Sequence, residues 1–101
     1  MMKCRINYPK VISQVDSIKN NVSELSAQIK ILNQIEQDCR DVWKGQAADT
    51  FMEKLNVLCS EMNRTKVQMS DLASTIKFCA DKIKKEDEQV NQRAAELKSG
   101  H

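Results

Sequence analysis

Turn-forming residues are scarce in this sequence of 101 residues. Gly45 and Gly100 are the only glycines, and Pro9 is the only proline. A β-sandwich or a β-barrel needs a turn signal about every 8–12 residues, so the sequence excludes both folds. Charged residues make up 30% of the chain, a composition typical of long helices that face solvent.

Residue types that support catalysis or metal binding are also scarce. The only histidine, His101, is the last residue, and none of the four cysteines lies in a C-x-x-C pair. This spacing is poor for zinc, and the sequence has no phosphate-binding glycine loop and no nucleophile beside a base. We therefore predict that the protein is not an enzyme and that it has no catalytic residue, no metal site and no cofactor.

Charges of one sign do not gather on any long segment. The formal net charge is +2, and the basic cluster of Lys82, Lys84 and Lys85 is followed at once by three acidic residues at 86–88. A nucleic-acid-binding protein would show a face of one sign, so we predict no nucleic-acid partner. No stretch approaches the roughly 20 apolar residues that span a bilayer, so we predict no membrane insertion.

The first eight residues carry charge but lack the apolar run of a secretory signal peptide. We therefore expect the chain to be made in the cytoplasm, where thiols are kept reduced. If it is exported, it leaves without a cleaved signal peptide. A Cys4–Cys79 disulfide formed after export is left open, as is the redox state of all four cysteines.

Two heptad patterns dominate the chain. In the first, two lines of positions spaced by seven are apolar at nine of ten sites, with Glu36 as the exception: Val15, Val22, Ile29, Glu36 and Trp43, and Val11, Ile18, Leu25, Leu32 and Cys39. Alternating steps of four and three are typical of the seam between packed helices. The pattern predicts a helix over about residues 10–43, with Pro9 in its first turn, where a missing N–H costs nothing.

The second pattern predicts a longer helix over about residues 46–97. Its first apolar line is Ala48, Leu55, Met62, Met69, Ile76, Ile83, Val90 and Leu97. The line taken as its companion is Phe51, Leu58, Thr65, Leu72 and Cys79, which becomes charged at Glu86 and Arg93. A neighbouring line of Met52, Cys59, Ala73, Ala80 and Ala94 widens the stripe.

A short turn over residues 43–46 joins the two predicted helices. Gly45 lies where the first periodicity ends, and glycine often ends helices because it enters the left-handed region without a Cβ clash. Asp49 then suits the first turn of the next helix. So short a connection makes the helices antiparallel. The predicted fold is an all-α antiparallel two-helix hairpin in a single domain over 1–101.

One hairpin does not use all the apolar positions of this sequence. The second helix is longer than the first by roughly 27 Å, which leaves Ile83, Val90 and Leu97 without a partner. We therefore predict that two hairpins pair into a four-helix bundle dimer, with homodimer and heterodimer both open. The residues predicted to form the hairpin or dimer seam are Val15, Ile18, Val22, Leu25, Ile29, Leu32, Phe51, Leu55, Leu58, Met62, Met69, Leu72 and Ile76.

The predicted turn carries Trp43, Lys44 and Gly45, a W-x-G tripeptide near mid-chain that follows a full heptad run. Phe51 comes six residues after the glycine. In length, architecture and motif position this resembles the WXG family of early-secreted-antigen-like helical hairpins, which are substrates of bacterial type VII secretion. The resemblance implies that Trp43 and Gly45 form the W-x-G turn at the tip. An interface role for Trp43 is compatible with a role in capping the core.

The family has a second signal near the end of its second helix, an aromatic residue followed four positions later by Asp or Glu. The matching positions here are Ile83 and Asp87, where the acidic residue fits the pattern and the aromatic one does not. The resemblance thus implies a degenerate export signal at Ile83 and Asp87. In family members that travel as heterodimers, the partner chain carries the signal. The signal of the partner then lies at the same end of the dimer as the W-x-G turn of the first chain.

The function implied is that of a small non-enzymatic substrate, or a co-secreted partner or targeting factor, of a type VII (ESX-like) system. Expected partners are a second copy of the chain, a related hairpin or a larger toxin-like substrate, together with the secretion ATPase. The residues alone leave an alternative, a cytoplasmic coiled-coil adaptor or assembly subunit with no secretion role. In that case Trp43 and Gly45 only build the turn.

Overall fold

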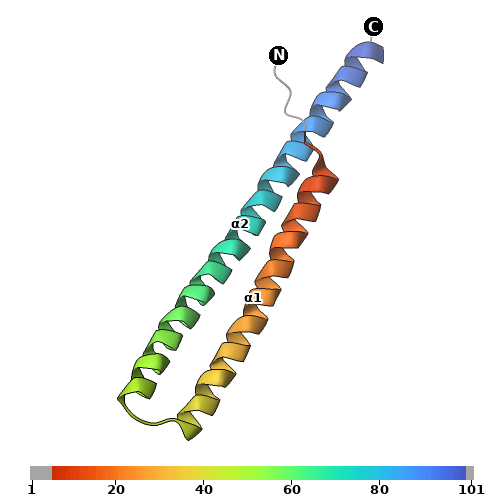
Figure 1. The fold of residues 1–101 in the computed structure, drawn as a ribbon. Helices are drawn as coiled ribbons and strands as arrows, with labels where there is room; N and C mark the ends of the chain where they lie inside the picture. The colour runs from red at the N-terminus through yellow and green to blue at the C-terminus, as the bar shows by residue number, and fades with distance from the viewer. Residues whose placement is uncertain (1–5, 100–101) are drawn as a thin grey trace.

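The computed structural model describes residues 6–99, which form two antiparallel helices joined by a tight turn (Figure 1). Helix α1 spans Tyr8–Val42 and helix α2 spans Gln46–Ser99. The radius of gyration is 23.5 Å, whereas a compact domain of about 100 residues has roughly 13 Å. The protein is therefore a rod with principal extents of 85 × 18 × 12 Å, and the predicted all-α hairpin is confirmed.

Helix α1 begins two residues earlier than the heptad pattern predicts, because Asn7 caps it. The Asn7 side-chain oxygen accepts a hydrogen bond from the backbone N–H of Lys10 at 3.2 Å, which satisfies one of the free donors of the first turn. Pro9 lies in that turn, as expected. The helix ends at Val42, after which Trp43 is extended and donates its backbone N–H to the Cys39 carbonyl at 2.8 Å.

The structure corrects the role assigned to Gly45. Because α1 ends at Val42, Gly45 does not terminate the first helix but stands immediately before the second. It has φ of +116°, which side-chain-bearing residues rarely adopt. Its carbonyl accepts the backbone N–H of Asp49 at 3.0 Å, so Gly45 starts the hydrogen-bond ladder of α2. The positive φ is what turns the chain back within three residues.

The core is a single narrow seam between the two helices. Among the described residues, Val15 is the only large side chain with less than 2% exposure. The buried apolar residues are Val15 and Ile29 of α1, and Ala48, Met52, Leu55, Cys59, Ala73 and Ala80 of α2. Many of the α2 residues are small, which lets the two helix backbones approach closely while burying little apolar surface per turn.

The seam of α2 has two lines of residues, and the structure corrects the prediction for the second one. Met52, Cys59, Ala73 and Ala80 are buried, whereas Phe51, Leu58 and Leu72 are 39%, 46% and 53% exposed. Consecutive residues of a helix point about 100° apart, so only one of two adjacent lines can face α1. Of the other predicted seam residues, Val15, Ile29 and Leu55 are buried, and Ile18, Val22, Leu25, Leu32, Met62, Met69 and Ile76 are half-buried.

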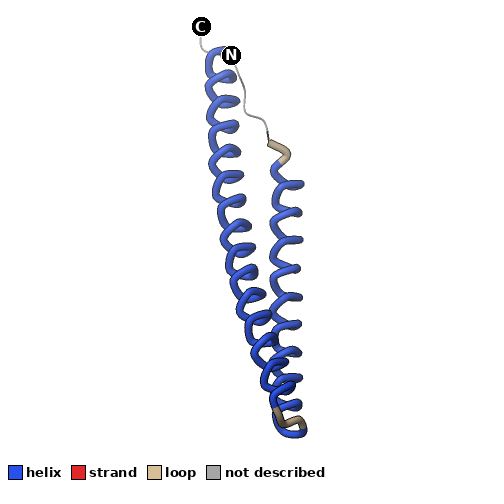
Figure 2. The backbone as a smooth tube through the Cα atoms, turned by 60° about the vertical axis from the view of Figure 1, so that its left-hand side comes forward, coloured by secondary structure: helices blue, strands red, loops and turns tan. Residues whose placement is uncertain are grey.

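Helix α2 continues well past the start of α1 (Figure 2). Tyr8, the first residue of α1, contacts Asp81, so residues 82–99 extend beyond it by roughly 27 Å. Leu97 is 82% exposed on this segment. Neither helix in the described part of the chain contains a stretch long and apolar enough to cross a membrane.

Candidate interaction surface at the hairpin tip and along the second helix

The tip of the hairpin presents an exposed pair of aromatic rings. The Trp43 and Phe51 ring centroids lie 5.4 Å apart with the planes tilted by 44°, a favourable arrangement for two aromatic rings. Trp43 is 42% exposed, so its contact with Phe51 covers only part of the indole. The pair joins the turn to the first turns of α2 and still leaves apolar surface open to a partner.

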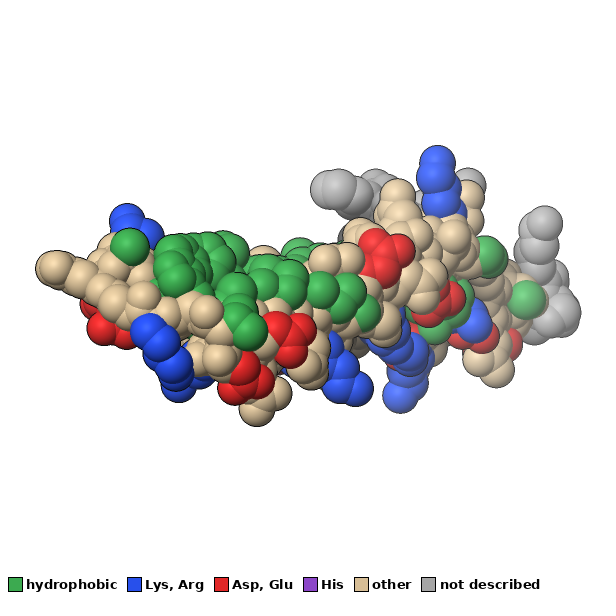
Figure 3. Space-filling model, turned by 60° about the horizontal axis from the view of Figure 1, so that its bottom comes forward, with side chains coloured by type: hydrophobic (Ala, Val, Ile, Leu, Met, Phe, Trp, Pro, Cys, Tyr) green, Lys and Arg blue, Asp and Glu red, His purple; other side chains and the backbone are tan. Residues whose placement is uncertain are grey.

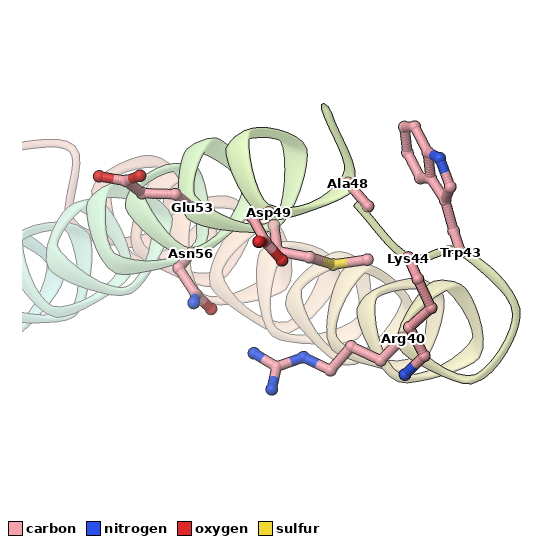
Figure 4. A pocket seen from close by; sticks show the side chains of 8 residues that line it. Arg40, Trp43, Lys44, Ala48, Asp49, Glu53 and Asn56 are labelled. Atoms are coloured by element: carbon pink, nitrogen blue, oxygen red, sulfur yellow. The ribbon is translucent and has the colours of Figure 1, made fainter. Parts of the chain in front are cut away.

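A shallow groove at the tip has a mixed lining. The charged residues Arg40, Lys44, Asp49 and Glu53 line it together with the apolar residues Trp43, Ala48 and Met52, and Figure 4 shows the Trp43 indole directed away from the Lys44 side chain. Arg40 also pairs with Glu36 at 2.7 Å, which explains how the one acidic residue of the first heptad line is accommodated beside the seam. No serine, cysteine or histidine lines this groove, so it offers no nucleophile with a base.

Part of the exposed apolar surface lies along one face of the rod, while Ile31, Val57, Val67 and Phe78 are exposed outside this face. On α2 the face comprises Phe51, Leu58, Leu72 and Cys79, each one position before a residue of the buried line. In an antiparallel pair the positions that flank the seam on one side of both helices share a face, which adds Ile35 and Val42 of α1. Figure 3 shows hydrophobic side chains gathered in a band along the rod. We call the surface of Ile35, Val42, Phe51, Leu58, Leu72 and Cys79 the apolar face.

The positions that flank the seam on its other side are almost all polar. They are Lys19, Ser26, Asn33 and Arg40 on α1, and Asp49, Asn56, Asn63, Ser70 and Lys77 on α2, with Ile12 as the apolar exception. The two sides of the seam therefore differ in polarity, although Ile31, Val57, Val67 and Phe78 leave further apolar surface exposed on the outer faces of the helices.

The amount of exposed surface also points to a missing contact. The accessible surface is 8067 Å², whereas a compact monomer of 11.6 kDa exposes about 5,800 Å². A typical stable interface removes about 800 Å² from each partner. The hairpin thus has enough surplus surface for an interface of more than ordinary size.

A polar cluster holds the open end of the hairpin together. The Tyr8 hydroxyl donates to one oxygen of Asp81, and Lys77 pairs with the other oxygen at 2.9 Å. The Lys84 ammonium lies 4.5 Å from the centre of the Tyr8 ring, within cation–π range. The hydrogen bond from Tyr8, followed by that from Lys77, lowers the pKa of Asp81, and the bonds to Asp81 raise the pKa of Tyr8 and of Lys77. No sequence pattern pairs Tyr8 with Asp81, although folding the chain at the turn brings them level.

Compared with known protein families, the chain matches WXG100, described as proteins of 100 residues with WXG, over residues 3–88. The chain belongs to the WXG100 family. Proteins of this family are non-enzymatic substrates of type VII secretion, and the family implies dimerisation with family members. No curated protein and no solved structure matches the chain.

In this WXG100 hairpin Trp43 and Gly45 lie in the turn at the tip, where the resemblance places them. Ile83 and Asp87 are both half-buried, four residues apart on α2, and lie just beyond the Tyr8–Asp81 contact. One chain therefore keeps the W-x-G turn and the Ile83–Asp87 pair at opposite ends of its two-helix part (Figure 1). Only a second hairpin packed head to tail could bring such a pair next to the turn.

The cysteines of the described residues are free thiols in three different environments. Cys59 is buried in the seam, Cys39 is half-buried and Cys79 is exposed on the apolar face. Cys4 lies outside the described residues, so a Cys4–Cys79 disulfide stays a hypothesis. Among residues 6–99 no three His, Cys, Asp or Glu side chains are grouped to hold a metal ion.

Proposed function

We propose that this WXG100 protein is a type VII secretion substrate or co-secreted targeting partner that works as one half of a four-helix bundle. The apolar face is the contact surface in this proposal. The observation that carries it is the exposure of Phe51, Leu58 and Leu72 on a hairpin whose seam is already formed by other residues. Full burial of such a side chain from water is worth about 1.5–3 kcal/mol, and because these three are already about half covered, completing their burial in a complex would add about half of that each.

The proposed recognition surface for the secretion ATPase is composite. The exposed Trp43 ring and the Gly45 turn of one hairpin would lie beside the partner's C-terminal signal, which corresponds to the positions of Ile83 and Asp87 in this chain. Together these residues would present an aromatic ring, a tight turn and a carboxylate at one end of the bundle. An exposed Trp beside a carboxylate is a suitable anchor for a protein partner.

The residue at position 83 favours export together with a partner over export of this chain by itself. Isoleucine stands where the family signal has an aromatic ring, so the signal on this chain lacks the ring that the ATPase would read. A related hairpin, or the helical N-terminal domain of a larger toxin-like substrate, would supply an intact signal. The protein would then leave the cell with that partner, without a cleaved signal peptide.

A secretion assay in the organism that encodes the protein tests this proposal. The tagged chain is followed in cells and in culture medium, with and without the type VII ATPase, and a cytoplasmic protein serves as the control for lysis. We expect ATPase-dependent export. Equal amounts in the medium of both strains, or none in either, would contradict a secretion role.

Substitution of the tip residue separates recognition from turn building. Trp43→Ala should abolish export while the protein keeps its helicity and its oligomeric mass, because only part of the indole is packed on Phe51. Asp41→Ala, at a neighbouring exposed residue outside the apolar face, is the matched control and should be exported normally.

The alternative function is a cytoplasmic adaptor or assembly subunit. The Trp43–Phe51 contact favours it, because that contact gives Trp43 a purely structural use in closing the turn. On this alternative, Trp43→Ala would lower stability by about 0.5–1.5 kcal/mol, the usual worth of an aromatic pair. The protein would also stay in the cells of both strains.

A further inference from the structure

One cation of α2 can reach Asp87 along the helix surface, and the structure holds it elsewhere. On a helix, a side chain meets the side chains three and four positions away. For Asp87 these positions are occupied by Ile83, Lys84, Val90 and Asn91. Lys84 is the only cation among them, and its ammonium lies 4.5 Å from the centre of the Tyr8 ring of α1.

The Lys84 side chain is directed toward the polar cluster at the open end of the hairpin. Side chains of an α-helix lean toward its N-terminus, which favours contact of Lys84 with the preceding turn. The Tyr8 ring lies there, because its hydroxyl donates to Asp81. The pKa of Asp81 is lowered first by the hydrogen bonds from Tyr8 and Lys77, and the charge of Lys84 adds to this lowering. Lys84 is thus engaged on the side of its turn that faces away from Asp87.

Asp87 keeps a carboxylate that no cation of the described residues neutralises. Within residues 6–99 the ion pairs are Arg40 with Glu36 and Lys77 with Asp81. Asp87 is half-buried, whereas Glu86 and Glu88 on either side of it are exposed.

We propose that Tyr8 is a positioning residue for recognition of this end of the chain: its ring holds the Lys84 ammonium, so that the Asp87 carboxylate stays free for a protein partner. This inference rests on the proposed function, because it gives a use in recognition to the acidic residue of the degenerate export signal. It adds a residue of α1 to a surface otherwise made by α2.

The ring and the hydroxyl of Tyr8 have separable roles. The hydroxyl binds Asp81, and the ring face binds Lys84. Tyr8→Phe removes only the hydroxyl, whereas Tyr8→Leu removes both contacts. In Tyr8→Leu the released ammonium can pair with Asp87 three positions away or with Glu88 four positions away, as oppositely charged residues do on helix surfaces.

NMR of the purified chain tests whether Tyr8 holds Lys84, without any export. Protons above the face of an aromatic ring resonate upfield, so the ε-methylene protons of Lys84 should lie upfield of those of Lys82. The shift should persist in Tyr8→Phe and vanish in Tyr8→Leu, with circular dichroism to check that each protein is helical. Lys84 protons that coincide with those of Lys82 in the wild type would overturn the inference.

A rescue experiment tests the use of the free carboxylate. Each tagged variant is quantified in cells and in medium, with and without the type VII ATPase. Tyr8→Leu should lower ATPase-dependent export by about two- to fivefold, the range that one surface ion pair allows, and Tyr8→Phe should leave it unchanged. Adding Lys84→Gln to Tyr8→Leu should restore export. Adding Lys82→Gln, the same charge change five positions from Asp87, should not restore it.

The outcomes separate this inference from the function on which it rests. A wild-type chain that is not exported contradicts the proposed function, and with it the use of Asp87 in recognition. If the wild type is exported through the ATPase and Tyr8→Leu is exported equally well, the inference alone is overturned. A defect in Tyr8→Leu that Lys84→Gln does not repair also overturns it, since Tyr8 would then serve only to close the hairpin.

Discussion

Two neighbouring lines of α2 have the same heptad spacing and opposite environments. Met52, Cys59, Ala73 and Ala80 are at most 8% exposed and close the hairpin, while Phe51, Leu58, Leu72 and Cys79, each one residue earlier, are exposed. The buried line is made mostly of small side chains, and the exposed line carries the larger ones. The seam of α2 thus combines these small residues with larger ones such as Leu55 and Met62, while Phe51, Leu58 and Leu72 stay exposed on the hairpin.

The same comparison explains why the isolated hairpin has so thin a core. Small side chains bury little apolar area, and hydrophobic stabilisation scales with that area at about 25 cal/mol per Å². Under the proposed function, a partner that covers the apolar face would add to this stability, because a partner that binds only the folded form stabilises it.

The largest effect is expected from a charge in the buried line. Ala73→Asp places an unpaired carboxylate at a site that is 1% exposed in the seam. We expect a loss of about 3–5 kcal/mol, enough to unfold a marginal hairpin. Circular dichroism during urea unfolding measures it, and Ser74→Asp, at the exposed next position, is the control. Retention of wild-type helicity and midpoint by Ala73→Asp would show that the seam is elsewhere.

A charge in the exposed line should weaken dimerisation and leave the packing of the hairpin seam unchanged. Leu72→Asp removes an apolar side chain from each copy of a two-fold dimer, so about 3 kcal/mol of pairing energy is lost. The dissociation constant should rise about a hundredfold. Analytical ultracentrifugation measures this shift. If Leu72→Asp leaves the dissociation constant unchanged, the exposed line is not the interface.

The turn should respond less strongly. Gly45→Ala forces a Cβ onto a backbone with φ of +116°, while no neighbouring atom lies within 4 Å of the new carbon. The cost is therefore one of backbone conformation alone, about 1–2 kcal/mol. Thermal unfolding at fixed concentration measures it, with Lys44→Ala as the comparison. An unchanged melting temperature would mean that the turn relaxes to a negative φ.

The smallest effect is a dependence on pH at the open end. The hydrogen bonds from Tyr8 and Lys77 lower the pKa of Asp81. The stabilisation is fully present above the unfolded pKa near pH 4 and is lost as pH falls through the lower folded value. An NMR titration of the Asp81 carboxyl should show a lower midpoint in the wild type than in Tyr8→Phe. Equal midpoints would show that Tyr8 does not hold this carboxylate in solution.

The helix periods and the turn could be predicted from the sequence because both are local. Steps of four and three in the apolar residues mark the helices, and Gly45 marks the chain reversal. The earlier start of α1 was missed although Asn7 was a visible signal, since Asn accepts a cap hydrogen bond well. The true position of Gly45, before α2 rather than after α1, depends on backbone dihedrals that composition does not encode.

The choice between two apolar lines could not be made from hydropathy. Phe51 and Met52 are both apolar, as are Leu58 and Cys59, so periodicity alone accepts either line. The choice depends on how α1 and α2 are rotated against each other, which hydropathy does not encode. The Tyr8–Asp81 hydrogen bond was also beyond sequence reasoning, since it joins residues 73 positions apart. The roles of Trp43, Ile83 and Asp87 in export stay predictions.

The central claim is that the exposed line of α2 is covered by another hairpin. Multi-angle light scattering of the purified chain under reducing conditions, over a range of concentrations, tests it most directly. We predict a folded helical species at twice 11.6 kDa that dissociates on Leu72→Asp. A fully helical and stable species at 11.6 kDa at every concentration would show that the hairpin is stable as a monomer, and would contradict the claim that its exposed line is covered.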